Sequence, residues 1–136
     1  MISGTMVLLI DSDSEELGSL SSYLRRNGIE MFEASDGLSG LREFFNVHPD
    51  VVVVDLNVTE MTGWQVIGRI RELSDIPVVV IASQATNEHV SKAFQLGVDG
   101  FLTRPFDPGD LLTRLNAIQN RGADANEKRW VYQRNG

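Results

Sequence analysis

The sequence of 136 residues contains no cysteine, which excludes disulfide bonds and thiolate metal sites and leaves the redox compartment open. It has no apolar run approaching the roughly 18 residues that a membrane-spanning helix needs. No signal-peptide pattern opens the chain, and we expect residues 1–5 to be a short leader. The remaining composition, with 42% hydrophobic residues, is typical of one globular domain with a single core.

Positive charge is also scarce. There are 12 lysine and arginine residues against 19 aspartate and glutamate residues, so the net charge is −7. Residues 123–136 carry two acidic and three basic side chains, a net charge of +1, which leaves −8 on residues 1–122. Such an acidic body is repelled by phosphate backbones, so we expect it not to bind nucleic acid directly.

Short apolar runs alternate with helical periods along the chain. We expect strands at residues 6–10, 29–34, 51–55, 78–82 and 101–103. The first helix is predicted to begin at Asp13, since Glu16 follows at capping-box spacing, and the last at Asp107, which precedes Pro108. Apolar periods over residues 38–45, 66–70 and 90–94 predict the three helices between them.

This alternation predicts a parallel sheet with right-handed crossovers and helices on both faces. We expect one domain over residues 6–122, followed by a polar linker at residues 123–136. Within that linker, Trp130 to Tyr132 look like the opening of another strand. The chain is then either a fragment cut just inside a second domain or a domain with a docking tail.

Two carboxylates are placed where such sheets carry their chemistry. Asp55 ends the valine run of residues 51–54, and Asp11 follows the first apolar strand. In a doubly wound sheet of flavodoxin-like order 2-1-3-4-5, these strands are neighbours and both acids face one crevice. Because close carboxylates repel, a cation between them is expected, and oxygen ligands suit Mg²⁺. A carboxylate beside Mg²⁺ can accept a phosphoryl group.

Over roughly residues 5–122 the chain resembles the receiver domain of bacterial two-component response regulators. The matching residues are Asp11, Asp55, Gly63 and the segment 97–106, GVDGFLTRPF, which is similar to the family's GADDYLTKPF. The resemblance implies a flavodoxin-like (βα)5 fold with five parallel strands, a cytoplasmic location, and no enzyme activity beyond self-phosphorylation.

The resemblance also implies a set of site residues. Asp55 would accept phosphate from the phosphohistidine of a sensor histidine kinase. Asp11, Asp55 and the Asn57 carbonyl would hold Mg²⁺, and the bond between Arg104 and Pro105 would be cis.

The last helix is similar to that of the winged-helix regulators, the OmpR/PhoB group. The segment of residues 111–117, LLTRLNA, followed by Arg121, carries this similarity. It implies a homodimer through the fourth helix, fifth strand and fifth helix, and DNA contact only through an output domain outside this sequence. The charged residues that could supply the dimer face are Glu88, Lys92, Asp99, Asp110 and Arg114.

Three positions depart from the receiver pattern. The family has a second acid after the first strand, a hydroxyl at the end of the fourth strand, and a lysine before the proline. This chain has Ser12, Ala82 and Arg104 there. Ser83 stands one residue late, and it reaches the pocket only if the strand ends early or bulges, because strand side chains alternate between faces.

These departures change the expected chemistry. Loss of the second acid predicts weak or absent Mg²⁺ binding. Ala82 lacks the hydroxyl that acts, with the aromatic at Phe101, in the family's switch, so control by phosphorylation is doubtful. Arg104 is expected either to contact a phosphate or, without metal, to pair permanently with Asp55 or Asp11 and mimic an activated state.

Three functions therefore stay open. The first is a phosphoacceptor domain that controls a DNA-binding output. The second is a protein-binding and dimerisation module that needs no phosphoryl chemistry, with Arg104 locking its pocket. The third and most distant is a small FMN-binding flavodoxin-type protein, although no hydroxyl-rich phosphate loop follows the first strand. Simpler structural interpretations also exist: Asp55 could cap the end of a strand, Asp11 could be an acid at a helix start without metal, and Phe101 could be a core aromatic.

Overall fold

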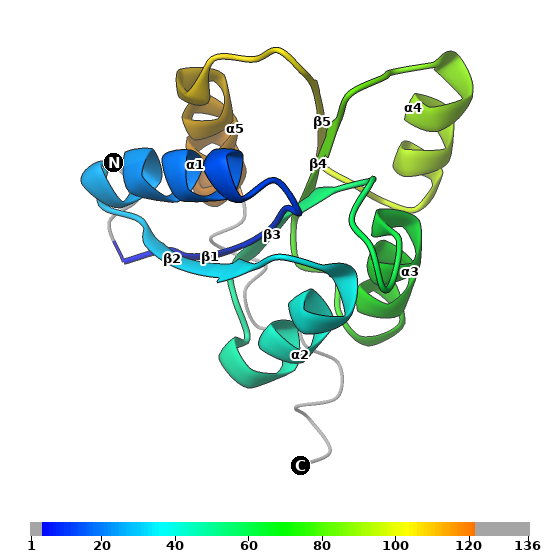
Figure 1. Ribbon diagram of the computed structural model, residues 1–136, viewed down its shortest axis with the longest axis horizontal. Coiled ribbons are helices and arrows are strands. Elements are labelled where there is room, and N and C mark those ends of the chain that lie inside the picture. Colours follow the sequence, from blue (N-terminus) through cyan, green and yellow to red (C-terminus); the bar gives the residue numbers. More distant parts are fainter. Residues whose placement is uncertain (1–3, 122–136) are drawn as a thin grey trace.

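The structure, a computed structural model, describes residues 4–121 as strands that alternate with helices (Figure 1). The strands are β1 (Met6–Ile10), β2 (Glu30–Ala34), β3 (Val51–Asp55), β4 (Val78–Ala82) and β5 (Gly100–Thr103). The helices are α1 (Ser14–Arg26), α2 (Gly37–Val47), α3 (Gly63–Leu73), α4 (Asn87–Gln95) and α5 (Pro108–Arg121). The expected linker over residues 123–136, with Trp130 to Tyr132, lies outside the described residues, as do residues 1–3 of the expected leader.

The strands form one parallel sheet in the order β2-β1-β3-β4-β5. The predicted fold class and strand order are therefore confirmed. Every residue of β3 and β4 is buried, as expected for central strands that are covered on both faces. Their valine-rich runs suit this position because β-branched side chains pack well on a pleated sheet.

Helices cover both faces of the sheet (Figure 1). Alternate residues of β1 show the division, since Leu8 and Ile10 enter one core, and Val7 and Leu9 enter the other. The first core packs against α2, α3 and α4, and the second against α1 and α5. Both faces of the sheet are thus covered by helices.

Helix starts agree closely with the sequence pattern. Asp13 caps α1 and accepts hydrogen bonds from two backbone N–H groups, as predicted. A complete capping box occurs at α3, where Thr62 and Gln65 bond reciprocally. Strand β2 begins one residue later than expected, and β5 begins one residue earlier, at Gly100. None of the helices in residues 4–121 is long and apolar enough to cross a membrane.

Gly63 brings α3 close to the end of β3. A Cβ atom at this position would lie 2.6 Å from Leu56 Cα and 2.7 Å from the carbonyl oxygen of Asp55. Only glycine permits this approach, which fixes the loop that follows Asp55. The loop therefore holds the central carboxylate at the edge of the sheet.

Candidate functional site

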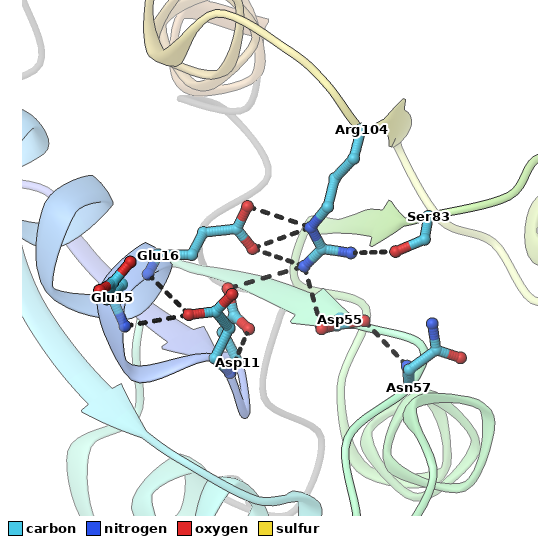
Figure 2. Close-up of polar contacts among 8 residues, drawn as sticks. Asp11, Glu15, Glu16, Asp55, Asn57, Ser83 and Arg104 are labelled. Carbon is cyan, nitrogen blue, oxygen red and sulfur yellow. Dashed lines mark hydrogen bonds and ion pairs between the residues drawn. The ribbon is translucent and has the colours of Figure 1, made fainter.

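The functional residues lie at the carboxyl edge of the sheet, where several strands end (Figure 2). Asp11 follows β1, Asp55 ends β3, and Arg104 follows β5. Pairing of Ile10 with Val54 places the ends of β1 and β3 side by side. The structure thus brings together the three side chains that the sequence assigned to one pocket.

Arg104 is the centre of this pocket (Figure 2). Its Nη2 donates to Asp55 Oδ2 at 3.0 Å and lies 3.7 Å from Asp11 Oδ2. Its Nε lies 3.0 Å from both carboxylate oxygens of Glu16, and its Nη2 also donates to Glu16. The peptide bond between Arg104 and Pro105 is cis, as the family resemblance implied.

Each aspartate divides its two oxygens between its own loop and Arg104. Asp55 Oδ1 accepts from the backbone N–H of Asn57 at 2.9 Å, and Asp11 Oδ1 accepts from that of Asp13 at 3.0 Å. The second oxygen of each carboxylate faces the guanidinium. Because Asp11 is fully buried and Asp55 is 4% exposed, both carboxylates depend on these few partners.

The pocket holds an excess of negative charge, and the pKa values of two of its acids are shifted in opposite directions by different causes. Burial and the nearby carboxylates of Glu16 and Asp55 raise the pKa of Asp11 to about 8, against the opposing hydrogen bond from the backbone N–H of Asp13. Hydrogen bonds from Arg104 hold the pKa of Glu16 below its ordinary value. The pKa of Arg104 is raised, chiefly by Glu16. At neutral pH a proton on Asp11 therefore relieves part of the repulsion.

Glu16 is the functional residue that the sequence analysis missed. Its spacing from Asp13 predicted a capping box, but the backbone N–H of Asp13 bonds to Asp11, so the reciprocal half of the box is not formed. The Glu16 side chain turns instead to Arg104, which lies 88 residues away in the sequence. A capping pattern reports only local bonds, so it gave no signal of this contact.

The residues expected to hold Mg²⁺ do not fit the metal in this arrangement. A guanidinium lies against both aspartates, and Ser12 is exposed and adds no charge. Within residues 4–121 no group of three histidine, cysteine or acidic residues has a geometry that could hold a metal ion. The positive charge that two close carboxylates need is supplied by Arg104.

The switch positions lie beside this pocket. Ala82 is the buried last residue of β4, and Phe101 is half-buried against the core under α3 and α4. Strand β4 ends at Ala82, which frees Ser83 to turn its hydroxyl toward the pocket, where it accepts from Arg104 Nη1 at 3.2 Å. A cavity of about 350 Å³ adjoins them, lined by Leu56, Asn57, Trp64, Ala82, Ser83, Gln84 and His89.

The charged residues proposed for a dimer face are not equivalent. Asp99 is half-buried, pairs with Arg71 at 3.7 Å and accepts from the N–H of Val78 at 3.0 Å, so it is engaged within its own chain. The Lys92 ammonium lies 4.5 Å from the ring centre of Trp64. Four of the predicted residues are exposed, namely Glu88, Lys92, Asp110 and Arg114.

Comparison with known proteins identifies the same kind of domain in a family model and in curated relatives. The family model for the response regulator receiver domain matches residues 7–116. The transcriptional regulatory protein PrrA of Mycobacterium leprae is 33% identical over 126 residues, which are 91% of this chain and 54% of that protein. The transcriptional regulatory protein KdpE of Mycobacterium tuberculosis is 33% identical over 123 residues, which are 90% of this chain and 54% of that protein. The chain spans about half the length of the curated relatives it matches.

Solved structures agree with the fold. A response regulator receiver domain from Clostridium thermocellum has a TM-score of 0.81 at 25% identity, covering 86% of this chain and 95% of that chain. A two-component response regulator from Clostridium difficile has a TM-score of 0.84 at 23% identity, covering 88% of this chain and 98% of that chain. The second likeness supports the fold alone.

Proposed function

Because the chain belongs to the response regulator receiver domain family, we propose that it is the regulatory domain of a transcription factor and that Arg104, rather than a metal ion, supplies the positive charge in its acidic pocket. The relatives named as transcriptional regulators are about twice as long, which supports an output domain beyond this sequence. In this proposal residues 123–136 lead toward that domain, and DNA is contacted only through it. Membership of the receiver family leaves no support for the flavin-binding alternative.

One observation carries the proposed mechanism, namely the hydrogen bond from Arg104 Nη2 to Asp55 Oδ2 at 3.0 Å. The oxygen that would attack a phosphorus atom is already paired with a cation. The same guanidinium offsets part of the negative charge of the neighbouring acids, so the pocket already contains a positive charge of the kind that a metal would otherwise supply. The domain then communicates through its surfaces in a fixed state, without phosphorylation.

The test is the intact mass of the protein after incubation with acetyl phosphate and MgCl₂. We expect the wild-type mass to stay unchanged, as for Asp55→Asn. A phosphoryl adduct on the wild type that is absent from Asp55→Asn would contradict the mechanism. A parallel MgCl₂ titration followed by tryptophan fluorescence should show no saturable change.

The second candidate is a phosphoacceptor domain with a sensor histidine kinase as its partner. It is favoured by the position of Asp55 at the end of a central strand and by the Ser83 hydroxyl, which faces Arg104 at the rim of the pocket. Arg104 would then have to leave Asp55 and contact the phosphoryl group. The mass measurement separates the two candidates, because this one requires the adduct on Asp55.

Constitutive signalling also requires an interaction surface. We propose a homodimer through the face of α4, β5 and α5, with Glu88, Lys92, Asp110 and Arg114 as its exposed charges. Asp99 stays with Arg71 in its own chain. Sedimentation without metal or phosphodonor should show a dimer at low micromolar concentration, and a strictly monomeric chain would refute this surface.

A further inference from the structure

Three carboxylates from separate parts of the chain converge on one nitrogen atom (Figure 2). Arg104 Nη2 contacts Glu16 Oε1 at 2.5 Å and Asp55 Oδ2 at 3.0 Å, and it lies 3.7 Å from Asp11 Oδ2. The acids come from α1, the end of β3 and the residue after β1. Their side chains thus surround a single positive centre.

A second observation shows that this centre needs a cation. Asp11 is fully buried, and its Oδ2 has no hydrogen-bond partner among the described residues. A buried carboxylate oxygen without a hydrogen bond is costly unless positive charge lies nearby. That oxygen lies 3.7 Å from Arg104 Nη2, so among residues 4–121 the guanidinium charge is what compensates it.

Glu16 makes good the missing acid of the pocket. Ser12 is exposed, whereas Glu16 lies in the first turn of α1 with its side chain 22% exposed. Its carboxylate contacts both Nε and Nη2 of Arg104, and such paired contacts fix the orientation of a guanidinium. Glu16 therefore positions Arg104 so that Nη2 points at the two aspartates.

We propose that Arg104 is the built-in cation of a three-carboxylate site in which Glu16 supplies the third carboxylate. Removing the guanidinium would then turn the same pocket into a binding site for a divalent cation, because Asp11, Glu16 and Asp55 would be left without compensation. This inference rests on the proposed function, in which Arg104 rather than a metal holds the pocket. It adds that Glu16 is the residue that holds Arg104, rather than a metal ion, as the cation of this pocket.

The first test is isothermal titration with MgCl₂ on the full chain, using wild type, Arg104→Met, and Arg104→Met combined with Glu16→Gln or with Glu15→Gln. Glu15 is the matched control, since it is an exposed glutamate next to Glu16 on the same helix. Arg104→Met should bind Mg²⁺ saturably. Adding Glu16→Gln should weaken binding by about tenfold or more, whereas adding Glu15→Gln should not, because affinity for hard cations follows the number of charged ligands.

Equal Mg²⁺ affinity in Arg104→Met with and without Glu16→Gln would overturn the role of Glu16. A folded Arg104→Met that binds no Mg²⁺ would overturn the latent site itself. If Arg104→Met unfolds in chelator, recovery of its circular dichroism in MgCl₂ supports the site, and failure to recover counts against it. Saturable binding by the wild type would instead refute the proposed function, so the two failures can be told apart.

A second measurement keeps Arg104 in place. The Nε–H of Arg104 should give a protected resonance in a ¹H–¹⁵N spectrum, because it is bound to Glu16. Glu16→Gln should shift this resonance and speed its exchange with solvent, whereas Glu15→Gln should leave it unchanged. An unaltered resonance in folded Glu16→Gln would refute the positioning role.

Discussion

Replacing Arg104 by methionine tests how much the pocket depends on its cation. The substitution keeps an unbranched side chain of similar reach and removes the guanidinium. Its contacts with Glu16 and Asp55 are lost, and Asp11 loses the one cation that lies within 4 Å of it in the described part of the chain. We expect the free energy of unfolding to fall in the absence of divalent cations.

The magnitude follows from burial. Breaking a buried ion pair from one side costs about 3–5 kcal/mol. Arg104 and Glu16 are each 22% exposed in their side chains, so solvent screens part of that loss. A proton on Asp11 removes one of the three negative charges. We therefore expect a loss of about 2–3 kcal/mol, which corresponds to a decrease in Tm of about 10 °C for a domain of this size.

The assay is urea denaturation at pH 7 in chelator, followed by circular dichroism. The control is Arg69→Met, the same chemical change at an arginine whose side chain is 57% exposed and whose only ion pair in the described part of the chain is at 3.9 Å. It should change stability by less than about 0.5 kcal/mol. If Arg104→Met is no more destabilising than Arg69→Met, Arg104 is not the centre of the pocket.

Three further predictions concern the titration of Asp11, the close backbone approach at Gly63 and the hydrogen bonds of Arg71. Folding raises the pKa of Asp11 to about 8, so Asp11 binds its proton more tightly in the folded state. The free energy of unfolding should therefore fall by about 1–3 kcal/mol between about pH 5 and pH 8. In urea melts, Asp11→Asn should flatten this slope, whereas Asp110→Asn should not. Gly63→Ala should destabilise the domain by about 2 kcal/mol or more, because the new Cβ would lie 2.6 Å from the backbone of Leu56. Gly68→Ala in the same helix is the control, since its Cβ meets nothing within 4 Å and should stabilise by about 0.5–1 kcal/mol. Equal effects of the two substitutions in thermal melts would refute the close approach. Arg71→Met should cost about 2–4 kcal/mol in urea melts, because three backbone carbonyls lose their donor, and a loss below about 1 kcal/mol would contradict this anchoring role.

Much of the fold could be predicted because its signals are local and periodic. The valine run before Asp55 required a strand buried on both faces, and β3 is such a strand. Parallel topology then placed the ends of neighbouring strands together, so Asp11 and Asp55 had to share one edge of the sheet. The meeting of these acids with Arg104 followed from topology, without knowledge of any side-chain conformation.

The partners of Arg104 were harder to predict because they depend on side-chain direction. Glu16 had a local explanation as a capping residue, and only coordinates show that its side chain leaves the helix end for Arg104. Donor capacity is the one signal that the sequence carries. A guanidinium has five N–H groups in a rigid fork, and each aspartate turns one oxygen to its own loop, so further acceptors around Arg104 are expected, although the sequence does not say which residues supply them.

The direction of the Ser83 side chain depends on whether strand β4 ends at Ala82 or one residue later. Side chains alternate along β4, so the residue after Ala82 would point away if the strand continued. The strand stops at Ala82, and the hydroxyl of Ser83 reaches Arg104. Strand ends are among the least predictable features of a sequence, because a single backbone bond decides them.

Charge repulsion disfavours a divalent cation beside the guanidinium of Arg104. A divalent cation placed about 4 Å from the guanidinium would be repelled by about 8 kcal/mol at an effective dielectric constant of about 20. This repulsion offsets part of the attraction between Mg²⁺ and the carboxylates, so we expect Arg104 to weaken Mg²⁺ binding in this arrangement. Phosphorylation with Mg²⁺ would first require Arg104 to leave Glu16, Asp55 and Ser83 together. Ser12 removes one acid from the pocket, and Arg104 keeps the positive charge of the family's lysine while its planar guanidinium contacts Glu16, Asp55 and Ser83 together, so the two departures change the partners of the basic residue rather than its charge.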